Sequence, residues 1–173
     1  MFRHLPPETT TPIIRPHMET QRHKEKNVKL IAALLCTTLI LISPHAFSRD
    51  TKHMLSIKEA MQSPDFKERL DPDIRFYFGQ QKHPKIHKSF GEFSSNKKTN
   101  AFNKSDEEAC RWVLLSALLS LQDRVKKEGG NAVINIASYY KKNKVSSNTK
   151  YECHAGAVIA GVALTGKVVK LAR

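Results

Sequence analysis

The sequence predicts an α+β fold with one long helix, several short strands and short helical turns in front of them. The helix is predicted because residues 105–130 combine an apolar stripe at helical spacing with a capping sequence at each end. The strands are predicted because the segments around it are rich in aromatic and β-branched residues and are divided by glycines. A basic region followed by an apolar run near the N-terminus predicts that a single domain occupies residues 49–173, with its core in 89–171.

Residues 49–73 are expected to form short helical pieces. Ser56 is placed to cap the segment IKEAMQ, and Ser63 followed by Pro64 is placed to start the segment DFKERL, because proline is favoured at the first helical position. The Asp-Pro-Asp sequence of residues 71–73 predicts a turn before the first strand.

Two strands are predicted between this turn and the long helix. The aromatic segment 75–78 is expected to be a strand that ends at Gly79, and a polar stretch continues from there to His87. Residues 89–96 alternate weakly, and their two phenylalanines share a face only if Gly91 lies in a bulge.

The long helix has signals at both ends. Ser105 and Glu108 form a capping box, and the acidic residues between them suit the positive end of the helix dipole. Two lysines lie in the last turn, and Gly129-Gly130 ends the helix. The apolar stripe consists of Cys110, Val113, Leu114, Ala117, Leu118, Leu121 and Val125.

The chain after the helix is expected to form strands. Residues 131–140 are apolar and β-branched, which favours a strand, and residues 141–150 predict a turn or hairpin tip. From Tyr151 the apolar chain is divided by glycines at five-residue intervals. This pattern predicts one long kinked strand or two short ones.

The N-terminal region has the order of a secretory signal. Lysines precede the apolar run Leu30–Ile42, and small residues precede Arg49. We expect residues 18–48 to be the signal, with cleavage between Ser48 and Arg49, and residues 1–17 to be an extension ahead of the natural start. A membrane anchor is the alternative, but the run's 13 residues span only about 20 Å as a helix, against about 30 Å of hydrocarbon. The expected product is periplasmic or secreted, with no stable membrane span after cleavage.

The expected domain contains two cysteines, Cys110 and Cys153, and an even pair in an oxidising compartment predicts a disulfide. A helix of about 20 residues is roughly 30 Å long, and a ten-residue strand returning from Gly130 covers about 33 Å. The next strand then starts beside the helix N-terminus, which places Cys153 near Cys110. The bridge would close a loop of 42 intervening residues and stabilise the fold by about 4 kcal/mol.

Three longer segments of this region are NKKTNAFNKSDEEACRW, GGNAVINIASYYKKN and YECHAGAVIAGVAL. Together they resemble a family of small exported bacterial proteins that often carry the label "excinuclease ATPase subunit" and have no established activity. The resemblance covers most of residues 49–171. The long helix followed by Gly-Gly-Asn-Ala-Val and a strand is also similar to YbjQ-like heavy-metal-binding domains and to the disulfide-stabilised Rcs envelope-stress sensor lipoprotein. These similarities imply a helix packed on a small, mainly antiparallel sheet.

Nucleotide hydrolysis is not expected in spite of that label. Residues 161–168 nearly match the phosphate-binding loop, but Val168 replaces the hydroxyl residue that would bind Mg²⁺. The segment is also an apolar strand pattern with no helix after it, so it lacks the backbone amides that cradle phosphate. We expect no catalytic residue and no cofactor, because no nucleophile stands in a pattern with an oriented base.

Metal binding is the second candidate function. The histidines considered as ligands are His83, His87 and His154. Pro84 makes a loop of the segment between the first two, and the last is adjacent to Cys153, so the two would point to opposite faces of a strand. No closed zinc pattern results. A metal-binding or metal-responsive periplasmic protein therefore stays as the alternative.

The basic charge indicates anionic partners. Residues 49–173 contain 23 Lys and Arg against 13 Asp and Glu, a formal net charge of +10. Such a surface attracts anionic polymers in a salt-dependent way, so nonspecific nucleic-acid binding is the third candidate. We expect a non-catalytic interaction module whose partner is an envelope protein or an anionic envelope polymer, with no specific nucleic acid. The lysines expected to contact it, unless they only solubilise loop tips, are Lys97, Lys98, Lys104, Lys141, Lys142 and Lys144.

Overall fold

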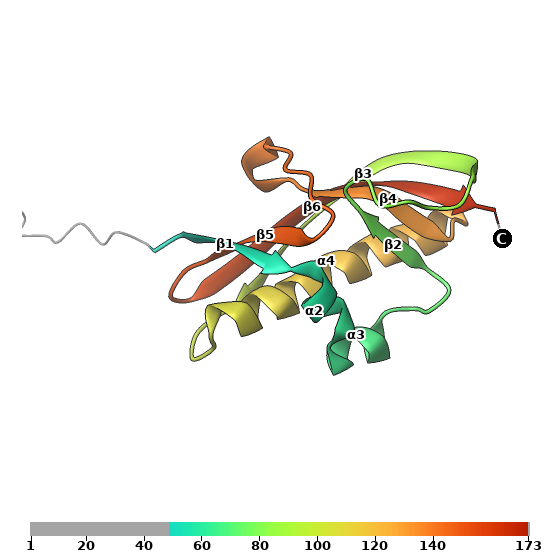
Figure 1. The fold of residues 1–173 in the computed structure, drawn as a ribbon. Helices are drawn as coiled ribbons and strands as arrows, with labels where there is room; N and C mark the ends of the chain where they lie inside the picture. The colour runs from blue at the N-terminus through green and yellow to red at the C-terminus, as the bar shows by residue number, and fades with distance from the viewer. Residues whose placement is uncertain (1–48, 173) are drawn as a thin grey trace, which may run out of the picture. The chain divides into compact units, whose positions relative to one another are not determined.

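The computed structural model describes residues 49–172 (Figure 1). The predicted signal and the residue before its cleavage site, Ser48, lie outside the described residues. The mixture of helices and one sheet confirms the α+β class. The elements are β1 (Thr51–Ser56), α2 (Ile57–Gln62), α3 (Pro64–Arg69), β2 (Arg75–Phe78), β3 (Ile86–Asn100), α4 (Asp106–Glu128), β4 (Ala132–Ser138), the short 3₁₀ turn η1 (Tyr140–Lys142), β5 (Lys150–Ala155) and β6 (Ile159–Leu171).

The sheet is forked, and its two branches both pair with the central strand β6. On one edge of β6, β3 runs antiparallel along the whole strand, from the pair Asn100–Ile159 to the pair Ile86–Leu171. The other edge is shared, because β5 pairs with the start of β6 and β4 pairs with its later part. β1 extends the β5 branch in antiparallel pairing, and β2 extends the β4 branch in the one parallel pairing of the described sheet. Each branch therefore ends in an edge strand.

Helix α4 begins and ends where its sequence signals are. The Ser105 hydroxyl accepts a hydrogen bond from the Glu108 amide at 3.1 Å, and Gly129 ends the helix in the left-handed conformation with φ 73°. The buried side chains of α4 belong to the same hydrophobic cluster as Val133, Tyr151 and Val162 from the strands. This cluster also includes residues of the 57–78 region, so the core extends beyond the predicted 89–171. The additional core residues are Ile57, Ala60, Phe66, Ile74 and Phe78.

The N-terminal elements differ in part from the expectation. Residues 51–56 are not helical: they form the edge strand β1, because their backbone pairs with β5 from Thr51–Ala155 to Ser56–Lys150. The two short helices are where they were predicted. The Ser56 hydroxyl caps α2 by accepting from the Glu59 amide at 3.2 Å, and Pro64 is the first residue of α3.

The strands on both sides of α4 agree with the expectation in part. β3 spans Ile86–Asn100 where 89–96 was predicted, so His87 is in a strand and not in the preceding loop. The register of β3 shifts between Ser89 and Gly91, where φ is 110°, as the predicted bulge requires. The segment from Tyr151 forms two strands, with one of its glycines in the turn between them.

The predicted disulfide between Cys110 and Cys153 is present, with their Cα atoms 5.8 Å apart. Both cysteines are fully buried in the main hydrophobic cluster. The bridge joins the first turns of α4 to the middle of β5.

Candidate functional site

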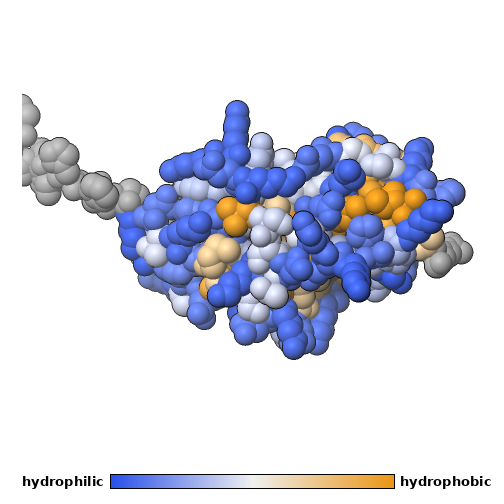
Figure 2. Space-filling view, turned by 45° about the horizontal axis from the view of Figure 1, so that its top comes forward, coloured by the Kyte–Doolittle hydropathy of each residue, from blue (hydrophilic) through white to orange (hydrophobic). Residues whose placement is uncertain are grey.

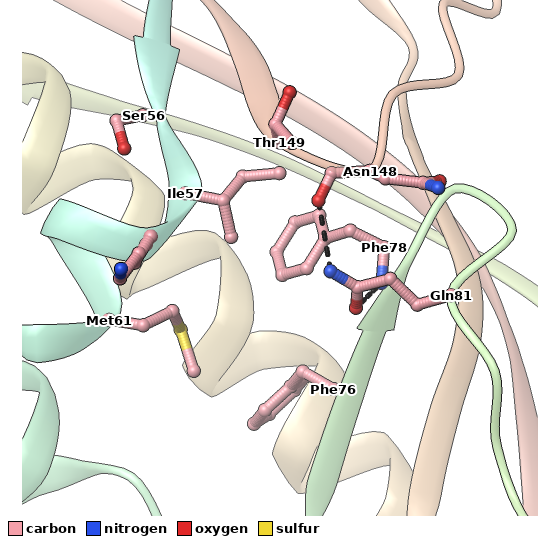
Figure 3. A pocket seen from close by; sticks show the side chains of 9 residues that line it. Ser56, Ile57, Met61, Phe76, Phe78, Gln81, Asn148 and Thr149 are labelled. Carbon is pink, nitrogen blue, oxygen red and sulfur yellow. Dashed lines mark hydrogen bonds between the residues drawn. The ribbon is translucent and has the colours of Figure 1, made fainter.

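An apolar groove lies between α2 and β2, and we call it the α2–β2 groove (Figure 3). Its volume is about 600 Å³. Figure 3 shows Ile57 and Met61 from α2 facing Phe76 and Phe78 from β2. The complete lining is Ser56, Ile57, Lys58, Met61, Phe76, Phe78, Gln81, Asn148 and Thr149.

Part of the groove lining belongs to the hydrophobic core. Ile57 and Phe78 are 5% and 3% exposed and pack in the main cluster. Met61 and Phe76 pack against this cluster but remain half-buried, so part of each apolar side chain still contacts water. Alternation along β2 explains why Phe76 and Phe78 point the same way.

A network of amide groups closes one end of the groove. The Gln81 side chain accepts from the Phe78 amide at 2.9 Å and donates to the Asn148 carbonyl oxygen at 2.9 Å, as the dashed lines in Figure 3 show. The Asn148 side chain accepts from the Gln80 amide at 2.7 Å. Gly79 makes the tight turn between them with φ 56°, a conformation that favours glycine. These bonds fix the loop before β5 against the end of β2.

The apolar surface continues past Met61 and Phe76 along α3. This second hollow is lined by the same two residues and by Phe66, Leu70 and Ile74, among others. The rim of the continuous surface is basic. Its exposed charged residues on the groove side are Lys58, Lys67 and Arg75.

One acidic residue, Asp71, also lines the second hollow, but it is already paired. Its carboxylate lies 2.9 Å from the Lys126 ammonium group. Hydrogen bonds from Lys126 and from the Asp73 amide hold the pKa of Asp71 below its ordinary value. The free charges beside the apolar groove are therefore positive.

A separate polar cluster surrounds His154 on β5. His154 places its Nδ1 3.0 Å from an Asp50 carboxylate oxygen and its Nε2 2.8 Å from a Glu152 oxygen. The Tyr140 ring stacks on the His154 ring with centroids 3.5 Å apart, and its hydroxyl donates to Asp50 at 2.9 Å. The cluster fastens residue 50 to β5.

The charges of this cluster shift its pKa values. The hydrogen bond from Tyr140, with help from His154, holds the pKa of Asp50 below its ordinary value, and the same bond raises the pKa of Tyr140. For Glu152, burial raises the pKa, but the bonds and charges of His154 and Lys52 outweigh it and leave the pKa lowered. With its polar groups bonded to one another, the cluster has a structural role.

The predicted lysines come from two segments of the chain, and one of each lies near Tyr140. Lys98 lines the same hollow as Tyr140, and the Lys141 ammonium group is 5.1 Å from the centre of the Tyr140 ring. Lys97 and Lys98 are at the end of β3, and Lys104 lies in the loop before α4. Lys141 and Lys142 are in η1, and the Lys144 ammonium group pairs with Glu92 at 2.6 Å. Figure 2 shows a face that is mostly hydrophilic, with separate hydrophobic areas.

The predicted histidines are on different elements. The His83 Nδ1 group donates to the Pro84 carbonyl oxygen at 2.8 Å, His87 is exposed on β3, and His154 is bonded within the polar cluster. Within residues 49–172, no group of three or more histidine, cysteine or acidic side chains is arranged to hold a metal ion. The region resembling a phosphate-binding loop, around Gly161 and Gly166, is part of the continuous strand β6.

No protein-family model, curated protein or solved structure matches the chain. The resemblance to the exported family therefore stays a prediction. None of the helices in residues 49–172 is long and apolar enough to cross a membrane.

Proposed function

We propose that this chain is an exported, non-catalytic, disulfide-stabilised interaction module of the cell envelope, and that its α2–β2 groove binds an extended segment of an envelope protein. The observation that carries the proposal is the apolar groove with a basic rim beside a sheet edge. An exposed apolar groove of this kind costs solvation free energy until a partner covers it.

The mode of binding follows from the place of the groove. β2 is the terminal strand of its branch, paired only with β4. On the outer edge of β2, the backbone groups of Phe78 are already bonded to Gln81. An added strand would therefore gain backbone hydrogen bonds at Phe76, and its alternate side chains would enter the groove at Met61 and Phe76. Lys58 and Arg75 on the rim favour acidic residues between the apolar ones. The preferred partner segment therefore alternates apolar and acidic side chains.

In this proposal the rest of the domain is a scaffold. One long helix, α4, packs on a small, mainly antiparallel sheet and fills the core behind the groove. This part of the proposal is supported by the buried cluster that α4 shares with β4, β5 and β6, and by the Cys110–Cys153 bridge. The cleaved signal, residues 18–48, would deliver this scaffold to the envelope.

The test uses short synthetic peptides that alternate valine with aspartate, and matched peptides that alternate valine with lysine. Binding to the protein recovered from the envelope is measured by fluorescence anisotropy. We expect the acidic peptides to bind more tightly. The double reversal Lys58→Glu/Arg75→Glu should weaken the acidic peptides by about three- to tenfold and favour the lysine peptides, because exposed charge pairs contribute up to about 1 kcal/mol each.

The matched control reverses a charge away from the groove, Lys88→Glu on β3. It changes net charge by half as much and leaves the rim intact, so it should keep the preference for acidic peptides. If the acidic peptides bind only through net charge, Lys88→Glu weakens them too, and the same binding disappears at high salt. That result would indicate that the partner is an anionic envelope polymer bound by net charge, and not a protein segment bound in the groove.

A further inference from the structure

Three strongly exposed apolar side chains gather at one end of the domain, and we call them the apolar tip: Phe102, Val158 and Ile159. They are 60%, 58% and 53% exposed. The Ala101 amide donates to the Val158 carbonyl oxygen at 2.7 Å, and Asn100 is the register partner of Ile159. The tip is therefore formed by two adjacent loops, one after β3 and one between β5 and β6.

The grouping of these three residues is stronger evidence for a binding surface than the exposure of any one of them. Single exposed apolar residues are common on soluble domains, whereas a cluster of them at a loop tip indicates a surface that meets an apolar partner. The one other large hydrophobic residue that is exposed within residues 49–172 is Ile86, which is 39% exposed and pairs with Leu171 at the opposite end of β6.

The first described residue lies at the same end as the tip. The Arg49 guanidinium donates to the Gly156 carbonyl oxygen at 3.1 Å and to the Asp106 carboxylate at 2.7 Å. Six residues separate Arg49 from the end of the apolar run at Ile42. The seven Cα–Cα steps between them reach at most about 25 Å. Before cleavage, an apolar run inserted in a bilayer therefore keeps the Arg49 Cα within about this distance of it.

The surface behind the tip has the chemistry of a membrane interface. A hollow of about 510 Å³ is lined by Val158 and Ile159 together with Arg49, Lys98 and Tyr140. Asp50 also lines it but is bonded to Tyr140 and His154. Basic and tyrosine side chains beside exposed apolar ones are what an interfacial protein presents to lipid head groups.

We propose that the apolar tip inserts into the interfacial layer of a lipid bilayer, so that the domain rests on the membrane from which it was delivered. The acidic first turn of α4, Asp106 to Glu108, offsets the nearby lysines. Apolar burial and not net charge therefore drives insertion, and the tip should bind zwitterionic lipid. This surface is independent of the α2–β2 groove, so either proposal can fail alone.

The test places a fluorescent reporter in the tip of the full chain. Trp112 is the sole tryptophan, so Trp112→Phe provides a silent background for Val158→Trp and, as the matched control, for Ile86→Trp. Both variants carry the same N-terminal segment and replace an exposed apolar residue. Each is mixed with phosphatidylcholine vesicles that carry bromine atoms on their acyl chains, and tryptophan emission is recorded.

We expect the V158W protein to show a blue shift and several-fold stronger bromine quenching than the I86W protein. Adding Ile159→Asp should reduce that quenching, because a charge opposes burial of the tip. Equal quenching in the two proteins would overturn the proposal. So would an emission wavelength typical of water-exposed tryptophan in both. A blue shift that grows with protein concentration without vesicles would also overturn it, since a second copy would then cover the tip.

Discussion

Removing the disulfide by the double substitution Cys110→Ala/Cys153→Ala should destabilise the domain by about 4 kcal/mol. The two cysteines are 43 positions apart. Closing a loop of that length lowers the entropy of the unfolded chain by an amount worth about 4 kcal/mol at room temperature. Both side chains are fully buried, so the alanines also leave a small cavity, which adds to the loss. Domains of this size have total stabilities of about 5–15 kcal/mol, so the variant is expected to be marginal.

Urea unfolding followed by circular dichroism measures this difference. The dependence of the unfolding free energy on urea should also steepen in the variant, because an unfolded chain without the bridge exposes more surface. Wild-type protein treated with reductant provides the control, since it loses the bridge and keeps the sulfur atoms. A loss below about 1 kcal/mol, with an unchanged urea dependence, would show that the bridge does not restrain the unfolded chain as argued.

Three further outcomes are expected from single positions. Phe66→Ala removes a side chain that is 1% exposed, and thermal unfolding should show a loss of about 3–5 kcal/mol. Gly166→Ala places a Cβ about 2.6 Å from a methyl carbon of Val133, so the urea midpoint should fall by the equivalent of about 1–3 kcal/mol. Glu152 has a lowered pKa in the folded state, so its ionised form stabilises the fold above the ordinary value of 4.5, and this contribution is lost as pH falls through the folded pKa. Urea midpoints measured between neutral and acidic pH should therefore decline less steeply in Glu152→Gln than in the wild type, and equal declines would contradict the role given to its bonds with His154.

Helix α4 was predictable because all of its signals are local. The capping box at Ser105, the stripe that includes Val113 and Leu121, and the ending at Gly129 lie within one segment and favour the same state. The disulfide followed from this helix, since its length and the returning strand bring Cys153 back to Cys110. For the helix and the disulfide, the interactions that determine the structure can be read from the local sequence pattern.

β1 and the full length of β3 were not predictable in the same way. Their pairing partners are far along the chain: Thr51 pairs with Ala155, and Lys97 pairs with Val162. β3 is an edge strand with many exposed polar side chains, so the apolar alternation that identifies a strand is weak there. The conformation of such segments is determined by pairing with distant strands and not by local propensity.

The candidate site was missed for a related reason. The α2–β2 groove joins Ile57, Phe76 and Asn148, which come from three separate elements. The sequence showed a cap at Ser56 and an aromatic strand, and both are present, but nothing in either pattern indicates that they face each other across a hollow. The predicted lysines were chosen by clustering in the sequence, and none of them lines the groove.

The forked sheet explains why the bridge lies where it does. β4 is paired with β6 at five positions, whereas β5 is paired with it only at His154–Gly161 and Ala155–Ala160. The β5–β1 branch therefore has little backbone pairing to the centre of the sheet. Its attachment comes instead from Cys153 bonded to α4 and from the contacts of His53 and Arg49 with Asp106. Because this branch also holds the apolar tip, the disulfide stabilises the end of the domain proposed to meet the membrane. The groove lies between the two branches, because Ser56 ends β1 whereas Phe76 and Phe78 belong to β2.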